Sequence, residues 1–203
     1  MTEEITDQPD GATPLDEVSG LLLTGITTRA ELDEVETVNI VNAVEWMERS
    51  REVDVFTVGF YRDLHKRMFD QVWAWAGELR SQTGAQTNVG PRAADVPTEL
   101  GRVAMEFARD WDGRGPDLLP FVARYHHALV WVHPFNNGNG RWSRLACDAI
   151  VQRVLNEPPL VWATDTLNRN SEERNEYLAA LRLADAGDIE PLLEYLLSLN
   201  PDR

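Results

Sequence analysis

Apolar residues recur at helical spacing along most of the chain. Between residues 28 and 51 they fall mostly three or four positions apart, and neither Gly nor Pro interrupts the run, as in an amphipathic helix. The same period predicts helices over residues 57–69, 98–111, 118–132, 141–155, 171–186 and 191–199. Thr27 or Thr28 can cap the first helix, and Gly187 can end the helix over 171–186. We therefore predict an all-α, mostly helical fold.

Two segments depart from this pattern. Residues 80–97 are rich in turn formers and have no helical period, which predicts an irregular loop or a short β-hairpin. Residues 1–14 are polar and acidic, with two prolines and a glycine, and we expect a disordered tail. No internal repeat and no second domain boundary is evident, so residues 15–203 are expected to form a single domain.

Composition and charge exclude several classes of protein. The net charge of −15 argues against nucleic-acid binding, which needs a basic face. No apolar stretch approaches the roughly 18 residues that span a bilayer, and the acidic N-terminus is not a secretory signal. Cys147 is the single cysteine, so it excludes an internal disulfide and is expected to be buried. A cytoplasmic location is the resulting expectation.

The acidic residues gather in the first third of the chain. Glu31, Asp33, Glu34 and Glu36 all fall within the first predicted helix. Such a run is typical of a solvated helix face, and a docking surface for a basic partner is the alternative.

The strongest chemical signal is the run HPFNNGNGRWSR at residues 133–144. His133 is a natural general base, because its unperturbed pKa lies near working pH. Gly138 and Gly140 let backbone N–H groups approach an anion, and the following helix points its positive end at the same place. The Asn139 amide can donate to a phosphate oxygen. These features together indicate phosphoryl or nucleotidyl transfer.

Two arginines and a phenylalanine complete this run. Arg141 and Arg144 lie three positions apart, so both project from one side of a helix. One guanidinium group can bind two phosphate oxygens at once, and two such groups suit successive phosphates of a nucleotide. Phe135 is expected to anchor the loop in the core. Taken singly, each of these residues has an ordinary structural explanation, and the functional interpretation rests on their joint spacing.

The run resembles the signature of the Fic family, His-x-Phe-x-(Asp/Glu)-Gly-Asn-Gly-Arg-x-x-Arg, at every position except 137. VWAWAGELR at 72–80 is similar to the segment that leads into the family's flap, and residues 174–196 are similar to its C-terminal helices. The resemblance covers roughly residues 28–199. TPLDE near the start and ITTRAELDEVETVNI resemble the bacterial branch called mobile mystery protein B.

This resemblance implies a fold and an activity. The fold would be the mostly helical Fic fold with a short β-hairpin flap at about 80–97. The activity would be AMP transfer from ATP to a Ser, Thr or Tyr hydroxyl of a target protein, with His133 as general base. Gly138, Asn139 and Gly140 would form the anion hole, Arg141 and Arg144 would hold the distal phosphates, and Mg²⁺ (or Mn²⁺) would bridge the phosphates.

Position 137 is the one departure from the signature. Asn137 stands where the family has an Asp or Glu that holds Mg²⁺, and an amide oxygen coordinates without charge. We expect weaker Mg²⁺ dependence and slower transfer than a carboxylate would give. One alternative is a catalytically weak nucleotide-binding protein in a toxin–antitoxin-like pair. Another is phosphorylation or the transfer of UMP or phosphocholine, although the intact Gly-Asn-Gly-Arg favours AMP.

Regulation and assembly give further expectations. Thr27-x-x-x-Glu31 fits the first half of the family's inhibitory motif, whose Glu pairs with the second motif arginine, here Arg144. Leu32 follows where Gly or Asn is expected, so a plain helix start is the alternative. An antitoxin-like partner protein can also supply inhibition, and an exposed apolar helix face can support a homodimer. Outside the run, we expect packing or surface roles for His65, His126, His127, Trp73 and Trp75.

Overall fold

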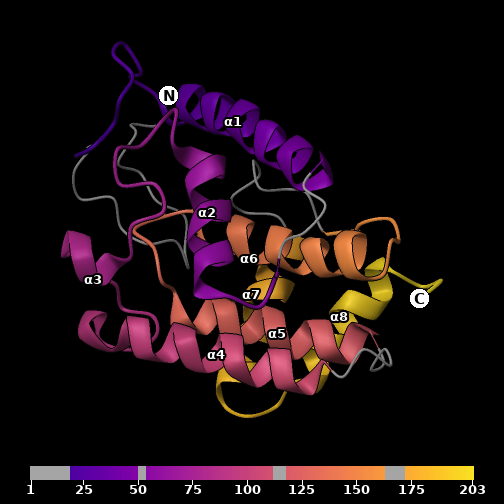
Figure 1. Ribbon diagram of the computed structural model, residues 1–203. Helices are drawn as coiled ribbons and strands as arrows, with labels where there is room; N and C mark the ends of the chain where they lie inside the picture. Colours follow the sequence, from indigo (N-terminus) through magenta and orange to yellow (C-terminus); the bar gives the residue numbers. More distant parts are fainter. Residues whose placement is uncertain (1–18, 50–53, 112–117, 163–171) are drawn as a thin grey trace.

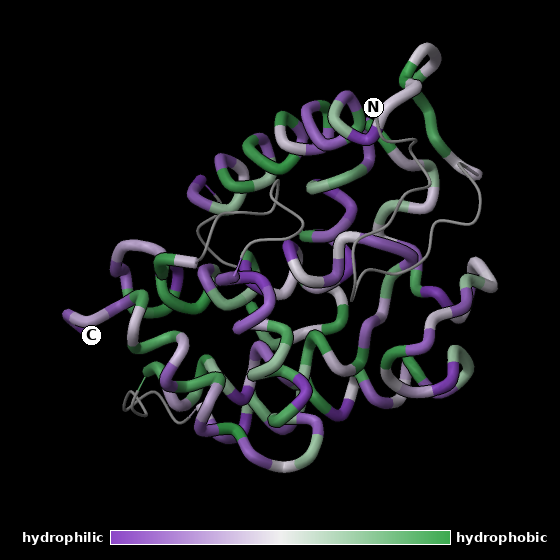
Figure 2. Tube along the Cα trace, turned by 180° about the vertical axis from the view of Figure 1, so that it is seen from behind, coloured by the Kyte–Doolittle hydropathy of each residue, from purple (hydrophilic) through white to green (hydrophobic). Residues whose placement is uncertain are grey.

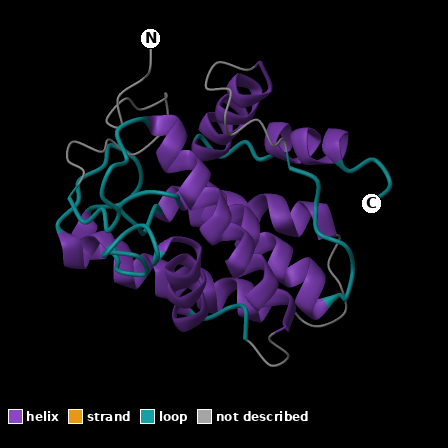
Figure 3. Ribbon diagram, turned by 90° about the horizontal axis from the view of Figure 1, so that it is seen from above, coloured by secondary structure: helices purple, strands orange, loops and turns teal. Residues whose placement is uncertain are grey.

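The computed structural model describes residues 19–49, 54–111, 118–162 and 172–203, which fold into helices joined by loops (Figure 1). The helices are α1 (Arg29–Arg49), α2 (Val58–Phe69), α3 (Arg80–Thr83), α4 (Val96–Asp110), α5 (Leu118–Val132), α6 (Asn139–Ala149), α7 (Glu172–Asp185) and α8 (Glu190–Leu199). A 3₁₀ turn occupies Ala93–Asp95, and a π-helical turn over Ile150–Val154 continues α6. These ranges contain no strand (Figure 3), and isolated bridges occur between Leu21 and Trp73 and at Thr28. The predicted all-α fold is confirmed.

The helix ends follow from local chemistry. The Thr57 hydroxyl accepts a hydrogen bond from the Phe60 N–H at the start of α2. At the start of α1, the Thr28 hydroxyl accepts from the Glu31 N–H while the Glu31 carboxylate accepts from the Thr28 N–H, which is a capping box. Gly187 takes a left-handed φ of 97° beyond α7. These ends lie within two residues of the predicted ones, because capping depends on neighbours in the sequence.

Helix α5 lies at the centre of the bundle and packs against α4, α6, α7 and α8, while α2 packs against both α1 and α6 (Figure 1). Buried aromatic rings fill the space between them. The Tyr125 hydroxyl of α5 donates to the Tyr61 hydroxyl of α2 at 3.0 Å, and the Trp142 indole of α6 donates to the Tyr61 carbonyl at 3.0 Å. These bonds join three helices and fix the start of α6 against the core.

Helix α1 covers one side of α2 and keeps an outer surface. Hydrophilic and hydrophobic residues alternate along it (Figure 2). Leu32, Ala43 and Met47 are buried, whereas Val38 and Val41 are more than half exposed. The helix therefore presents apolar side chains to solvent as well as to the core. None of the helices described is long and apolar enough to cross a membrane.

The β-hairpin expected over residues 80–97 does not form. This segment holds α3, a loop and the 3₁₀ turn (Figure 3). Arg80, which is almost fully buried, donates its backbone N–H to the Pro134 carbonyl at 2.8 Å. Its guanidinium donates to the carbonyls of His133 and Pro91. A side chain thus satisfies the Pro91 carbonyl of the segment, which a partner strand would otherwise bind. The tail predicted over 1–14 lies outside the described residues.

Candidate active site

The run 133–144 forms the turn between α5 and α6 together with the first turns of α6. His133 has a positive φ of 48°, which is uncommon for a residue other than glycine, and Arg80 Nε donates to its carbonyl at 2.7 Å. Gly138, which precedes α6, has a φ of 74°. A Cβ atom there would lie 2.5 Å from the ring of Phe69. Glycine is therefore required at this turn by both conformation and space.

The turn is braced from inside by side-chain amides and an aromatic stack. Asn139 accepts from the Phe135 N–H and donates to the Phe135 carbonyl, both at 2.9 Å. Phe135 is fully buried, as expected of an anchor, and His65 stacks on it with ring centroids 3.7 Å apart. The Asn139 side chain, expected to donate to a phosphate, thus closes the loop instead, and its backbone N–H is the group left at the start of α6.

His65 supports the loop by its position in α2. Its Nδ1 accepts from the Gly77 N–H at 3.0 Å, so its Nε2 carries the proton and donates to the Asn137 carbonyl at 3.0 Å. Burial lowers the pKa of His65 to about 3, which keeps it neutral. The packing role expected for His65 is confirmed. That it holds the motif was missed, because nothing in the spacing links positions 65 and 137.

His133 has the geometry of a base. Its Nδ1 lies 3.3 Å from the Val130 carbonyl, and a proton on Nδ1 leaves the lone pair on Nε2. Burial, and to a smaller degree the Arg80 charge, lowers the pKa of His133 to about 4. The imidazole is therefore neutral at pH 7 and able to take a proton from a hydroxyl group.

The start of α6 offers an anion site beside His133. The first hydrogen bond of this helix runs from the Trp142 N–H to the Gly138 carbonyl at 2.9 Å. The N–H groups of residues 139–141 precede it and have no partner within the helix. A Cβ atom at Gly140 would meet nothing within 4 Å. The helix end combines open space with donors, as an oxyanion site requires.

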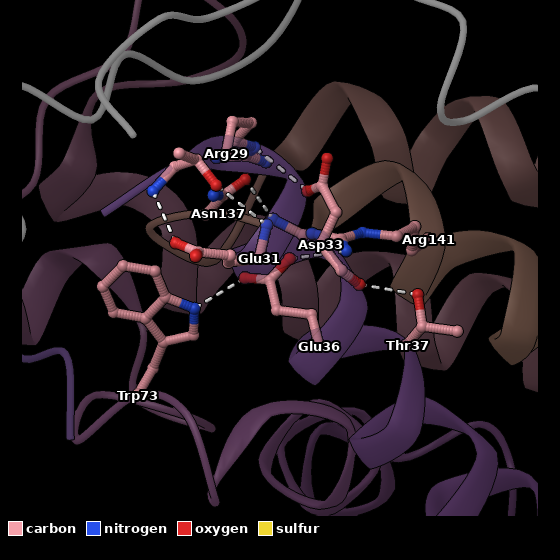
Figure 4. A network of polar contacts seen from close by, with 10 residues as sticks. Arg29, Glu31, Asp33, Glu36, Thr37, Trp73, Asn137 and Arg141 are labelled. Atoms are coloured by element: carbon pink, nitrogen blue, oxygen red, sulfur yellow. Dashed lines mark hydrogen bonds and ion pairs between the residues drawn. The ribbon is translucent and has the colours of Figure 1, made fainter. Parts of the chain in front are cut away.

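Arg141 is held by a buried glutamate. Its Nη1 donates to Glu36 Oε2 at 2.6 Å, and Trp73 Nε1 donates to Glu36 Oε1 at 2.6 Å (Figure 4). Glu36 has no exposed surface, so the expectation of a solvated acidic face is wrong at this position. The reason is that α1 packs against α2 and the segment after it, which a pattern of charges along one helix does not reveal.

Arg144 lies one turn after Arg141 in α6. Its charge acts on the pKa of His126 in α5 and on the pKa of Tyr177 in α7, whereas Arg141 contacts α1. Their joint binding of phosphates stays a prediction.

Glu31 lies at the exposed start of α1. Its carboxylate accepts from the backbone N–H groups of Thr27 and Thr28, both at 2.9 Å. These bonds, the Thr27 one first, lower the pKa of Glu31. The described contacts of Glu31 all belong to the helix start, so its pairing with Arg144 stays a prediction.

Asn137 does not present a metal ligand. Its Oδ1 accepts from the Gly138 N–H at 2.7 Å, which turns Nδ2 the other way. That Nδ2 is buried and has no hydrogen-bond partner. Within the described ranges, no three His, Cys, Asp or Glu residues gather to hold a metal. The donor set here therefore does not fit Mg²⁺, which requires oxygen ligands.

The remaining expectations for single residues can be compared with the structure. Packing roles are confirmed for the buried side chains of Trp73, Trp75, His126 and Cys147. His127, which is partly exposed, lies 2.8 Å from Asp185.

Comparison with known proteins identifies relatives. The family model described as the Fic/DOC family matches residues 55–151. A protein adenylyltransferase Fic from Nematostella vectensis is 26% identical over 172 residues, which are 81% of this chain and 38% of that protein. The chain thus spans well under half of that curated relative.

Solved structures agree with this relationship. Caenorhabditis elegans Fic-1 (residues 134–508 of that protein) has a TM-score of 0.64 at 26% identity, covering 91% of this chain and 52% of that one. The N-terminal Fic domain of a Bartonella quintana VirB-translocated Bep effector protein has a TM-score of 0.69 at 18% identity, covering 98% and 92%. The second likeness shows the fold alone.

Proposed function

Because the chain belongs to the Fic/DOC family, we propose that it is a protein adenylyltransferase that transfers AMP from ATP to a Ser, Thr or Tyr hydroxyl of a target protein. The observation that carries this proposal is a neutral His133 six residues before the start of α6, where the Cβ position of Gly140 is open. The Nematostella vectensis relative, named a protein adenylyltransferase, supports the choice of reaction.

The proposed reaction uses this geometry directly. His133 Nε2 takes the proton of the target hydroxyl while the hydroxyl oxygen attacks the α-phosphorus of ATP. A P–O bond forms to the target, the bond between the α-phosphorus and the bridging oxygen breaks, and pyrophosphate leaves. The N–H groups of Asn139 and Gly140 stabilise the charge that develops on the phosphoryl oxygens, whereas the Gly138 N–H is already bonded to Asn137. Arg141 and Arg144 bind the distal phosphates, and residues 80–97 hold the target peptide.

A metal ion contributes less to this proposed reaction than the family signature implies. Asn137 offers no charged ligand and its amide oxygen is already bonded. Mg²⁺ or Mn²⁺ would enter on the ATP phosphates rather than on a protein carboxylate at position 137. The expectations of a single domain over 15–203, of a bacterial cytoplasmic protein and of the mobile mystery protein B branch stay predictions beside this proposal.

One labelling experiment tests the nucleotide donor, the general base and the group that is transferred. The purified chain is incubated with cell lysate and ATP labelled at the α- or γ-phosphate. We expect protein labelling from α-labelled ATP only. His133→Ala should abolish it, whereas His127→Ala, a histidine on α5 outside the motif, should retain it. Labelling from the γ-phosphate would indicate a kinase, and labelling that survives His133→Ala would exclude this base.

Asn137 favours a second candidate, a nucleotide-binding protein of little or no activity that works with an antitoxin-like partner. In that case ATP binds but neither label is transferred. The exposed Val38 and Val41 on α1 offer a surface for such a partner or for a homodimer. Light scattering of the purified chain, with and without Val41→Glu, tests the dimer.

A further inference from the structure

One buried cation beside the site described above keeps two nitrogens without a hydrogen bond. Arg29, at the start of α1, is 8% exposed. Its Nε forms an ion pair with Asp33 Oδ1 at 3.0 Å, but neither Nε nor Nη1 makes a hydrogen bond. A buried, unbonded guanidinium nitrogen costs free energy, so it marks a place where an acceptor would be stabilised.

Two hydrogen bonds join α1 to the helical segment that begins at Asn139. Arg141 donates to Glu36, and Arg153 donates to the Glu48 carbonyl at 3.2 Å, and both pairs are 105 residues apart. These bonds hold α1 beside the start and the end of that segment.

Arg29 therefore lies on the side of α1 that faces the motif. It precedes Glu36 by seven residues, which is two helical turns, so both side chains leave the same face. Figure 4 shows Arg29, Asn137 and Arg141 around the start of α1. Asn137 Nδ2 is the second buried donor without a partner there. Two donors without hydrogen bonds, one of them cationic, thus lie near Glu36 and Arg141 (Figure 4).

We propose that Arg29 is a third arginine of the nucleotide phosphate site, acting with Asn137 Nδ2 where a carboxylate-bound metal would otherwise neutralise the phosphates. This inference rests on the proposed function, since the anion it assigns is the phosphate chain of ATP. A guanidinium group binds phosphate oxygens in pairs and carries its charge at every physiological pH. The neutral Asn137 is consistent with this arrangement, because a carboxylate at that position would compete with phosphate for Arg29.

Binding of ATP and of adenosine is measured by calorimetry, with Mg²⁺ or with excess EDTA. We expect the wild-type dissociation constant for ATP to change less than about threefold between the two conditions. Arg29→Met should weaken ATP about tenfold or more and leave adenosine unchanged. Arg49→Met, which removes an exposed arginine of the same helix, is the matched control and should behave as wild type.

Two more variants keep the test independent of folding. Asp33→Asn removes the carboxylate that competes for Arg29 and should tighten ATP, which a purely structural Arg29–Asp33 pair does not predict. Arg29→Met combined with Asn137→Asp should regain ATP binding with Mg²⁺ but not with EDTA. The inference is overturned if Arg29→Met binds ATP within twofold of wild type, or if ATP and adenosine weaken equally.

The two proposals fail in distinguishable ways. AMP transfer that persists at the wild-type rate in Arg29→Met would overturn this inference and keep the proposed function. Arg29-dependent ATP binding by a wild-type chain that transfers no AMP would keep this inference and overturn the proposed function.

Discussion

At the scale of single residues, buried polar groups define the site. Glu36 receives hydrogen bonds from Arg141 and from Trp73 and has no contact with solvent. His65 and Asn139 use their side chains to hold the backbone of the turn. Motif residues and their supports are thus of different kinds. In the proposed reaction the motif supplies the reacting groups, and residues far away in the sequence set their positions.

The variant Glu36→Gln tests whether a residue outside the motif sets the position of Arg141. The variant keeps the shape but removes the charge that holds Arg141, and breaking a mostly buried pair should cost about 2 kcal/mol or more of stability. We expect kcat/KM for AMP transfer to fall about tenfold, mainly through a higher KM for ATP. Urea unfolding and initial rates measure the two effects. Glu45→Gln, in an exposed pair on the same helix, should change neither.

Glu31 allows a separate prediction. If it also reaches Arg144 when the site closes, Glu31→Gly should raise auto-modification, as measured with α-labelled ATP. If its bonds at the helix start are its whole role, the variant should lose stability with no gain in labelling. The second result would leave inhibition to a partner protein.

At the scale of elements, the start of α6 packs against the core and is also the phosphate site of the proposed reaction. Gly138 faces the ring of Phe69, whereas the Cβ position of Gly140 is open. These two glycines stand two residues apart in one signature, but the structure assigns them different reasons. One is required by the fold, and the other leaves room for an anion.

Alanine substitution at each glycine should distinguish the requirement of the fold from the requirement of phosphate binding. Gly140→Ala should raise stability by up to about 1 kcal/mol, because alanine favours a helix, and should weaken ATP binding. Gly138→Ala should lower stability, because it combines a positive φ with a clash. Thermal unfolding and ATP titration of both variants test this. Unchanged ATP affinity in Gly140→Ala would place the phosphates elsewhere.

At the scale of the whole molecule, the buried histidines couple stability to pH. Burial lowers the pKa of His65 and His126 to about 3 and of His133 to about 4. The unfolded chain takes up protons near pH 6.5 while the folded chain does not. Stability is therefore complete above pH 6.5 and is lost as pH falls toward 4. Asp148, whose pKa burial raises to about 6, opposes part of this loss.

Urea unfolding at pH 7.5 and at pH 5 measures the combined effect of these four groups on the free energy of unfolding. Three histidines outweigh one aspartate, so we expect stability to fall by about 1 kcal/mol or more per pH unit over this range. His126→Gln should reduce the slope. Because His133 stays neutral down to about pH 4, AMP transfer should persist at pH 6 rather than fall with the ordinary histidine pKa. A transfer rate that falls with an apparent pKa near the ordinary histidine value of about 6.5 would contradict the buried state of His133.

The sequence by itself determined the helices and the turn that carries the chemistry. Helical period and capping are set by residues a few positions apart, and the positions of His133, Gly138 and Gly140 follow from one uninterrupted run. Only the tertiary structure decided that Glu36 is buried on Arg141 and that residues 80–97 form no hairpin. Each of these depends on contacts between residues from 11 to 105 positions apart, which a local pattern does not encode.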